Sequence, residues 1–292
     1  MLRVIFSLIF FIPVSVLAIV QPPVVFLSDY GLLDESVGVC KGVVISYNAE
    51  AKIIDLTHQV PAFSVKDASR YLAAATPYYP EGAIFMALVE KPGGKKTKKL
   101  VALTKKGQFI LAPNDGLITL VADREGISEV REIVEGEWIV KKDLESNFPG
   151  RDVYAKVAAH LSKKEDWKKV GPVLEKWERM ETKKSEASKK GTFGEILAVD
   201  GVFGNLVSNL SVMSLLNAGY TLGDTVRLRI ADKPFEMKFV KTFEDVPMGS
   251  FLIYIDTTDH ASLAINQGNF AGKHKIKVGA KVILQNKANS RE

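Results

Sequence analysis

Short apolar runs alternate with helix-like patterns through the first half of the chain. Residues 24–27 and 83–89 are apolar throughout, and 52–56 is mostly apolar. Runs of this length are typical of strands buried in a parallel sheet. Between the second and third, Ser64 is suited to cap a helix over 65–75, whose apolar residues recur at helical spacing. Strand, helix and strand in close succession predict parallel pairing with right-handed crossovers, and hence an α/β domain with a mainly parallel sheet.

The pattern changes after a polar stretch rich in Lys and Glu, at 163–190. Beyond it, short β-rich runs are separated by Gly, Asp and Asn, which predicts a smaller antiparallel β-barrel-like domain. We therefore expect four parts: a signal peptide (1–18), an α/β domain (19–172), a charged linker (173–190) and a β-barrel-like domain (191–292).

The first 18 residues have the pattern of a signal peptide. Arg3 supplies a positive charge, residues 4–17 are apolar, and Ala18 ends a small-residue cleavage pattern. The run is too short to span a bilayer comfortably. We expect cleavage after Ala18, no stable membrane span in the mature chain, and export to the periplasm or the medium. An uncleaved N-terminal anchor is the alternative.

Composition narrows the possible partners. The 292 residues are 47% hydrophobic and 25% charged, as in an ordinary globular protein. The formal net charge of +5 comes from scattered lysines, so a nucleic-acid partner is not expected. No Cys/His spacing suggests a metal site, and no phosphate-loop or dinucleotide fingerprint is present, so no metal or cofactor is expected.

The first strand ends in a carboxylate. The apolar run 24–27 is followed by Ser28-Asp29-Tyr30-Gly31, which has turn chemistry, and then by a helix-like stretch from Ser36. Parallel α/β sheets bind ligands where a strand turns into a helix in this way. Asp29 is therefore the first candidate functional residue. The alternative is that it only forms the turn.

Seven short motifs carry a resemblance to a known family. They are Leu27-Ser28-Asp29-Tyr30-Gly31, Cys40-Lys41-Gly42, Asp55-Leu56-Thr57-His58, Ala112-Pro113-Asn114-Asp115-Gly116, Gly150-Arg151-Asp152, Phe203-Gly204-Asn205 and Asn266-Gln267-Gly268-Asn269. In this order they resemble the S-adenosylmethionine hydroxide adenosyltransferases, relatives of the fluorinating and chlorinating enzymes. The resemblance runs from about 24 to 284.

The resemblance implies an adenosyl-binding α/β domain, a barrel-like C-terminal domain and a homotrimer. Ligand sites would lie where one subunit's N-terminal domain meets the next subunit's C-terminal domain. Family members attack the 5′ carbon of S-adenosylmethionine with hydroxide or a halide and release methionine. Because the sulfonium is a good leaving group, such a protein need only position and desolvate the nucleophile.

The resemblance also implies roles for individual residues. Asp29 matches the carboxylate that grips the ribose hydroxyls. Phe63 matches an aromatic beside the ligand, with a core aromatic as the alternative. Asp200 and Asn205 match groups that hold the methionine amine and carboxylate, unless they only shape a turn. Small hydroxyl residues near the methionine end are matched by Thr257 and Thr258.

Three positions depart from the hydrolysing members. Where those carry Asp, Arg and His to poise the water, this chain has Lys91, Lys98 and Pro149. The degenerate catalytic positions are thus Lys91 and Lys98. At ~4 Å a lysine would repel the sulfonium by about 4 kcal/mol at an effective dielectric of ~20. Lys91 either turns away, loses its charge and acts as a base, or belongs to a solvated loop over 91–99.

Two main functional hypotheses follow. The first is hydrolysis of S-adenosylmethionine to adenosine and methionine with an altered water-activating set, so enzyme status remains open. The alternative is a catalytically impaired, exported protein that binds an adenosyl compound. A third class, a structural or interaction module on the same scaffold, has only the export signal in its favour.

Overall fold

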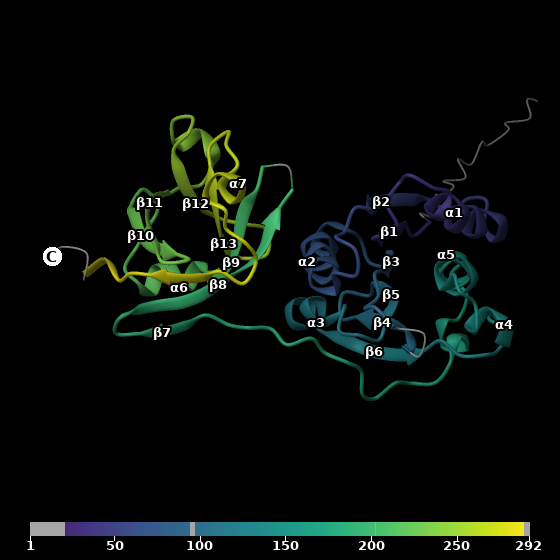
Figure 1. Cartoon of the computed structure of the whole chain (residues 1–292). Coiled ribbons are helices and arrows are strands. Elements are labelled where there is room, and N and C mark those ends of the chain that lie inside the picture. Colours follow the sequence, from purple (N-terminus) through teal and green to yellow (C-terminus); the bar gives the residue numbers. More distant parts are fainter. Residues whose placement is uncertain (1–20, 94–96, 202, 289–292) are drawn as a thin grey trace, which may run out of the picture.

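The computed structural model describes residues 21–93, 97–201 and 203–288. The predicted signal peptide lies outside these residues, so its cleavage and the export of the chain stay predictions. An N-terminal α/β domain and a C-terminal β domain lie side by side, joined by one extended segment (Figure 1). Within the described ranges, no helix has the length and apolar character needed to cross a membrane.

The described part of the N-terminal domain contains a six-stranded, mainly parallel sheet in the order β2-β1-β3-β5-β4-β6. Strands β2, β1, β3 and β5 run parallel, and β4 is antiparallel to both of its neighbours. The predicted sheet is therefore confirmed. The strands are β1 (Val24–Ser28), β2 (Ile53–Thr57), β3 (Ile84–Leu88), β4 (Lys99–Thr104), β5 (Phe109–Pro113) and β6 (Ile127–Glu132).

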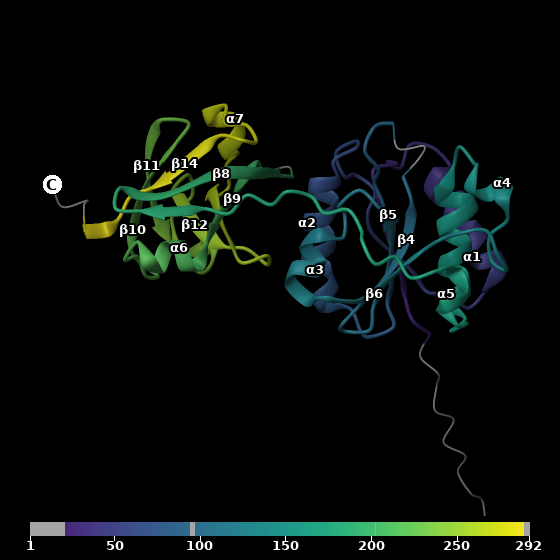
Figure 2. The same ribbon diagram turned by 90° about the horizontal axis from the view of Figure 1, so that it is seen from below.

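Helices cover both faces of this sheet (Figure 2). On β1, Val24 and Phe26 pack toward one helical layer, and Val25 and Leu27 pack toward the other. Ser64 caps the second helix as predicted, because its side chain accepts a hydrogen bond from the Asp67 amide. One layer holds α1 (Ser36–Tyr47), α4 (Lys141–Leu144), the π-helical turn η3 (Gly150–Tyr154) and α5 (Ala155–Ser162); the other holds α2 (Val65–Ala75) and α3 (Thr119–Glu125).

The C-terminal domain is a closed barrel. Its sheet has the order β14-β10-β11-β12-β13-β9-β8-β7, and a further pairing of β14 with β8 closes the ring and leaves β7 outside. A barrel was predicted, but it is mixed, because β11 and β12 pair in parallel. The elements are β7 (Glu186–Ser188), β8 (Gly191–Asp200), β9 (Asn205–Ser211), α6 (Val212–Asn217), β10 (Thr225–Ile230), β11 (Lys233–Phe239), β12 (Phe251–Ile255), β13 (His260–Ile265), α7 (Phe270–His274) and β14 (Lys281–Leu284).

The order of the parallel strands defines where a ligand can bind. From β1 the chain moves outward to β2 and then returns to β3 on the other side of β1. Open α/β sheets bind ligands beyond the carboxyl ends of the strands at such a switch point. Here the register pairs Ser28 with Leu88, so β1 and β3 end level with one another.

Candidate functional site

A cavity of about 220 Å³ lies at the carboxyl ends of β1, β3 and β5. Asp29 and Tyr30 follow β1, Glu90 follows β3, and Pro113 ends β5. The opposite wall comes from the segment before η3 and from η3 itself. The lining residues are Asp29, Tyr30, Phe63, Leu88, Glu90, Pro113, Asn147, Phe148, Pro149, Gly150 and Tyr154. We call this the Asp29 cavity.

Asp29 is held to the loop that precedes α2. Its Oδ2 accepts a hydrogen bond of 2.8 Å from the backbone N–H of Phe63. Phe63 has a φ of 61° and is 58% exposed, so it is not a core aromatic. A left-handed backbone at a bulky residue costs roughly 1–2 kcal/mol, and residues strained in this way cluster at active sites and ligand-binding loops. The strained residue thus lies at the rim of the cavity with its ring available.

Tyr30 and Gly150 form a tight contact inside the cavity. The Tyr30 ring meets the Phe148 ring edge-on at 5.7 Å. A Cβ at Gly150 would lie 2.5 Å from the Tyr30 hydroxyl oxygen, so only glycine allows η3 to approach this closely. Burial raises the pKa of Tyr30 and also that of Tyr154. Both hydroxyls are therefore neutral hydrogen-bonding groups at physiological pH.

A Ser, a His and an Asp are aligned behind Asp29 like a hydrolytic triad. The Ser28 hydroxyl lies 2.7 Å from His58 Nδ1, and His58 Nε2 lies 3.1 Å from Asp55 Oδ1. Ser28 is 0% exposed and His58 is 3% exposed, so no substrate can reach the serine. The His58 carbonyl also accepts a hydrogen bond of 2.8 Å from the Gly31 amide. The three residues therefore fix the turn that carries Asp29.

Two carboxyl groups beside the cavity are desolvated. Burial raises the pKa of Glu90, and it raises the pKa of Asp115 to about 6. Lys91 is bound to Asp115: its Nζ donates to the Asp115 carbonyl at 2.7 Å and its backbone N–H to Asp115 Oδ2 at 3.3 Å. Lys98 pairs with Glu132 at 2.7 Å and is 52% exposed, away from the Asp29 cavity.

The barrel residues form a second group. Asp200 and Asn205 lie opposite one another where β8 turns into β9. Asp200 is paired at 2.6 Å with Arg70 of α2 in the same chain. The Asn205 side-chain oxygen is buried and has no hydrogen-bond partner among the described residues. None of the barrel residues is among the described residues that line the Asp29 cavity.

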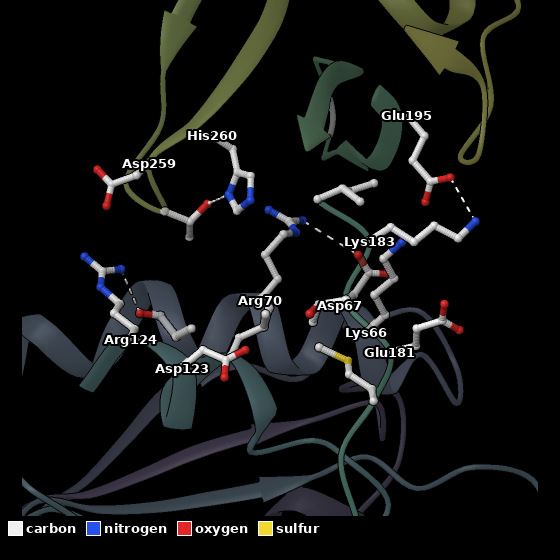
Figure 3. A pocket seen from close by; sticks show the side chains of 16 residues that line it. Lys66, Asp67, Arg70, Asp123, Arg124, Glu181, Lys183, Glu195, Asp259 and His260 are labelled. Carbon is white, nitrogen blue, oxygen red and sulfur yellow. Dashed lines mark hydrogen bonds and ion pairs between the residues drawn. The ribbon is translucent and has the colours of Figure 1, made fainter. Parts of the chain in front are cut away.

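A larger cavity of about 480 Å³ lies between the two domains (Figure 3). Arg70 and Arg124 rise from α2 and α3 toward Asp259 and His260 on the barrel side. Thr258 lines this cavity, and its hydroxyl lies 2.8 Å from His260 Nδ1. The neighbouring Thr257 uses its backbone carbonyl to accept a 3.1 Å hydrogen bond from Arg124.

A third cavity of about 320 Å³ lies between these two. It shares Phe63 with the Asp29 cavity and shares Lys66, Met180 and Glu181 with the interdomain cavity. Lys91 lines this middle cavity. The Asp29 cavity, the middle cavity and the interdomain cavity therefore follow one another along the face of the N-terminal domain. Phe63 lines both the Asp29 cavity and the middle cavity.

Metal chemistry has no obvious centre in the parts described. Among residues 21–93, 97–201 and 203–288, no group of three or more His, Cys, Asp or Glu side chains could hold a metal ion. What the site offers instead is one hydrogen-bonding carboxylate at Asp29, neutral tyrosines, and the desolvated carboxyl of Glu90.

Comparison with known proteins identifies the family. The family model for the SAM hydroxide adenosyltransferase N-terminal domain matches residues 24–171, and that for the C-terminal domain matches residues 194–283. The chain belongs to the SAM hydroxide adenosyltransferase family. The predicted resemblance is thereby confirmed.

Relatives of this adenosyltransferase family member include both halogenating and hydrolysing proteins. The chain is 32% identical to an (R)-S-adenosyl-L-methionine hydrolase of Salinispora arenicola, and the match covers 86% of this chain and 92% of the relative. It is 28% identical to a fluorinase of Actinopolyspora mzabensis, over 90% and 96%. An uncharacterized conserved protein from Thermotoga maritima has a similar structure, with a TM-score of 0.83 and 34% identity over 90% of this chain and 99% of that one.

The structure divides the site residues that the family resemblance predicted into two groups. Asp29, Phe63 and Pro149 meet at the Asp29 cavity, while Asp200, Thr257 and Thr258 lie toward α2, α3 and the interdomain cavity. Residues that sequence reasoning missed at the first cavity include Glu90, Tyr30 and Tyr154. Glu90 directly follows the predicted strand 83–89, so the rule that selected Asp29 could have selected it too.

Proposed function

We propose that this protein binds S-adenosylmethionine at the Asp29 cavity and hydrolyses it to adenosine and methionine. The observation that carries the proposal is the Asp29 carboxylate at the β1/β3 switch point, beside an exposed aromatic and a desolvated carboxyl, in a chain of this family. A carboxylate is suited to accept hydrogen bonds from two neighbouring ribose hydroxyls. Phe63 offers a ring face on which an adenine can stack.

The groups proposed for the methionine end come from the barrel. Asp200 would bind the ammonium. The buried Asn205 oxygen, which has no partner within the described part of the chain, is a second acceptor for it. Thr257 and Thr258 would lie nearby. Because barrel residues of the same chain do not line the described Asp29 cavity, we propose that a neighbouring subunit's barrel completes the site in a homotrimer. No nucleic acid, metal or further cofactor takes part, and the mature protein is exported.

Positioning of the attacking water is the first requirement of this hydrolysis. The sulfonium leaves as a neutral thioether, so the main requirement is a water held in line with the C5′–S bond in a site sheltered from bulk solvent. Lys91 lines the middle cavity and is not among the described residues that line the Asp29 cavity, and its ammonium is held at the Asp115 carbonyl, so its positive charge lies outside the proposed ligand site.

The test is incubation of the mature chain with S-adenosylmethionine, with adenosine followed by chromatography and binding followed by calorimetry. We expect saturable adenosine release well above the uncatalysed rate. Absence of both heat and release would contradict binding as well as catalysis.

A second candidate function is ligand binding without turnover. It is favoured by Pro149, which lines the Asp29 cavity where the hydrolysing members carry a histidine, and which has no proton to exchange. The same calorimetry separates the two candidates: binding of S-adenosylmethionine with no adenosine release supports the second and contradicts the first.

A further inference from the structure

We infer that Glu90 is the general base that deprotonates the attacking water, in place of the acid that the family's hydrolysing members carry at the next position. The inference rests on the proposed hydrolysis. In this chain the acid would stand one residue earlier, at Glu90, and Lys91 would take the position that carries the acid in the hydrolysing members.

The sheet directs Glu90 to the ligand end of the switch point. The register pairs Ser28 of β1 with Leu88 of β3. Asp29 lies one residue after Ser28 and Glu90 lies two residues after Leu88, so both lie just beyond the carboxyl ends of their strands. Both residues line one cavity of about 220 Å³. A group held on the ribose by Asp29 and a water activated by Glu90 would therefore share a single small space.

Lys91, by contrast, leaves the strand on another path. Lys91 lines the middle cavity, and its ammonium donates to the Asp115 carbonyl at 2.7 Å. Glu90 is thus the acidic group after β3 that lines the Asp29 cavity, and its negative charge suits a sulfonium ligand.

The surroundings of Glu90 suit a base. Burial raises the pKa of its carboxyl, while a hydrogen bond from the Thr97 side chain and the charge of Lys99 act in the opposite direction. A base is most effective when its pKa lies closer to the working pH than that of an exposed glutamate. The other groups near it are Tyr30 after β1, Asp115 after β5 and Tyr154 in η3.

The proposed step conserves atoms and charge. The water oxygen forms a bond to C5′ as the C5′–S bond breaks, and the bonding pair leaves with sulfur as the neutral thioether of methionine. The water proton passes to the Glu90 carboxylate and then to solvent. Water is the nucleophile and no oxidant or reductant is needed.

The decisive variant is Glu90→Gln, compared with the parent chain and with Glu129→Gln on β6 as the matched control. Loss of a general base lowers the rate by about 10²- to 10⁴-fold. We expect a loss of that size in kcat for Glu90→Gln, unchanged affinity for adenosine, and parent-like kcat for Glu129→Gln. The parent's rate should fall at acid pH as Glu90 protonates, and this limb should vanish in Glu90→Gln.

The outcomes separate this inference from the proposed function. Parent-like kcat in Glu90→Gln overturns the role of Glu90 and leaves hydrolysis intact. A parent that binds S-adenosylmethionine without releasing adenosine overturns both. Glu90→Asp is the control for misfolding, because it keeps the carboxylate and should recover part of the rate lost in Glu90→Gln. Activity no higher than that of Glu90→Gln would count against Glu90 as the base.

Discussion

Lys91 and Asp115 are joined by two hydrogen bonds, one of 2.7 Å from Nζ to the Asp115 carbonyl and one of 3.3 Å from the Lys91 amide to Oδ2. The pair ties the segment after β3 to the segment after β5. It also engages the ammonium of the lysine that directly follows Glu90.

This geometry gives a prediction for Lys91→Met, which keeps the length of the side chain and removes the charge. Because Nζ is held by a backbone carbonyl, we expect kcat for adenosine release to fall by less than tenfold. A neutral Lys91 acting as the base would instead give a loss of about 10²- to 10⁴-fold. Steady-state kinetics of adenosine release distinguishes the two.

Asp115 should leave a signature in the pH dependence of stability. Its pKa is raised to about 6 by burial, so the folded state holds this proton more tightly than the unfolded state does. The group therefore disfavours folding above pH 6, and this cost disappears as the pH falls toward 4. Between pH 7 and pH 4 the parent should gain about 2 kcal/mol in unfolding free energy relative to Asp115→Asn.

Urea denaturation of both proteins across this range measures that difference directly. Both proteins contain Asp55 and Asp152, whose pKa values are lowered and whose stabilising contributions are lost on acidification, so these contributions cancel in the comparison. A parent-minus-variant difference that does not change with pH would contradict the burial of a raised-pKa carboxyl at Asp115.

Asp29→Ala should weaken ligand binding at the first cavity. Hydrogen bonds to a charged group contribute about 1.5–3 kcal/mol, so we expect adenosine affinity to fall by roughly 10- to 150-fold. Asp34→Ala is the matched control, since its carboxylate is exposed and its hydrogen bonds are local, to the amide of Ser36 at 2.9 Å and to the Ser36 side chain. Equal affinities for the two variants, measured by calorimetry, would exclude Asp29 from the site.

Gly150→Ala should disturb the wall of the same cavity. The added methyl would lie 2.5 Å from the Tyr30 hydroxyl oxygen and 3.1 Å from a ring carbon of Phe148, so a ring must move. Overpacking of this kind costs about 1–3 kcal/mol of folding free energy. Thermal or urea unfolding checks the loss, and Gly38→Ala is the control because a Cβ there meets nothing within 4 Å.

The N-terminal domain could be predicted because its local signals agree with its tertiary structure. Apolar runs became β1 and β3, and Ser64 capped α2 at the predicted residue. In the barrel, the runs predicted as strands were 193–199, 225–230, 235–240, 250–255 and 281–285, and they do not include β9 or β13. β9 contains Ser208 and Asn209, which are buried here, although such residues usually favour turns. Tertiary burial overrode the local preference.

The site could be predicted only in part, for a related reason. The family resemblance predicted Asp29 and Phe63 as site residues, and the fold brings these two together at one cavity. It could not show that Lys98 pairs with Glu132 or that Asp200 pairs with Arg70, because such pairs depend on which strands and helices become neighbours. The position of Glu90 beside Asp29 likewise follows from the β1–β3 register.

The most direct test of the account is the reaction in ¹⁸O-labelled water, with the adenosine product analysed by mass spectrometry. Attack of water on C5′ puts one labelled oxygen into the 5′-hydroxyl, so we predict adenosine two mass units heavier, formed in proportion to the parent protein and strongly reduced with Asp29→Ala. Adenosine that carries no label, or that forms equally with Asp29→Ala, would contradict hydrolysis at the Asp29 cavity.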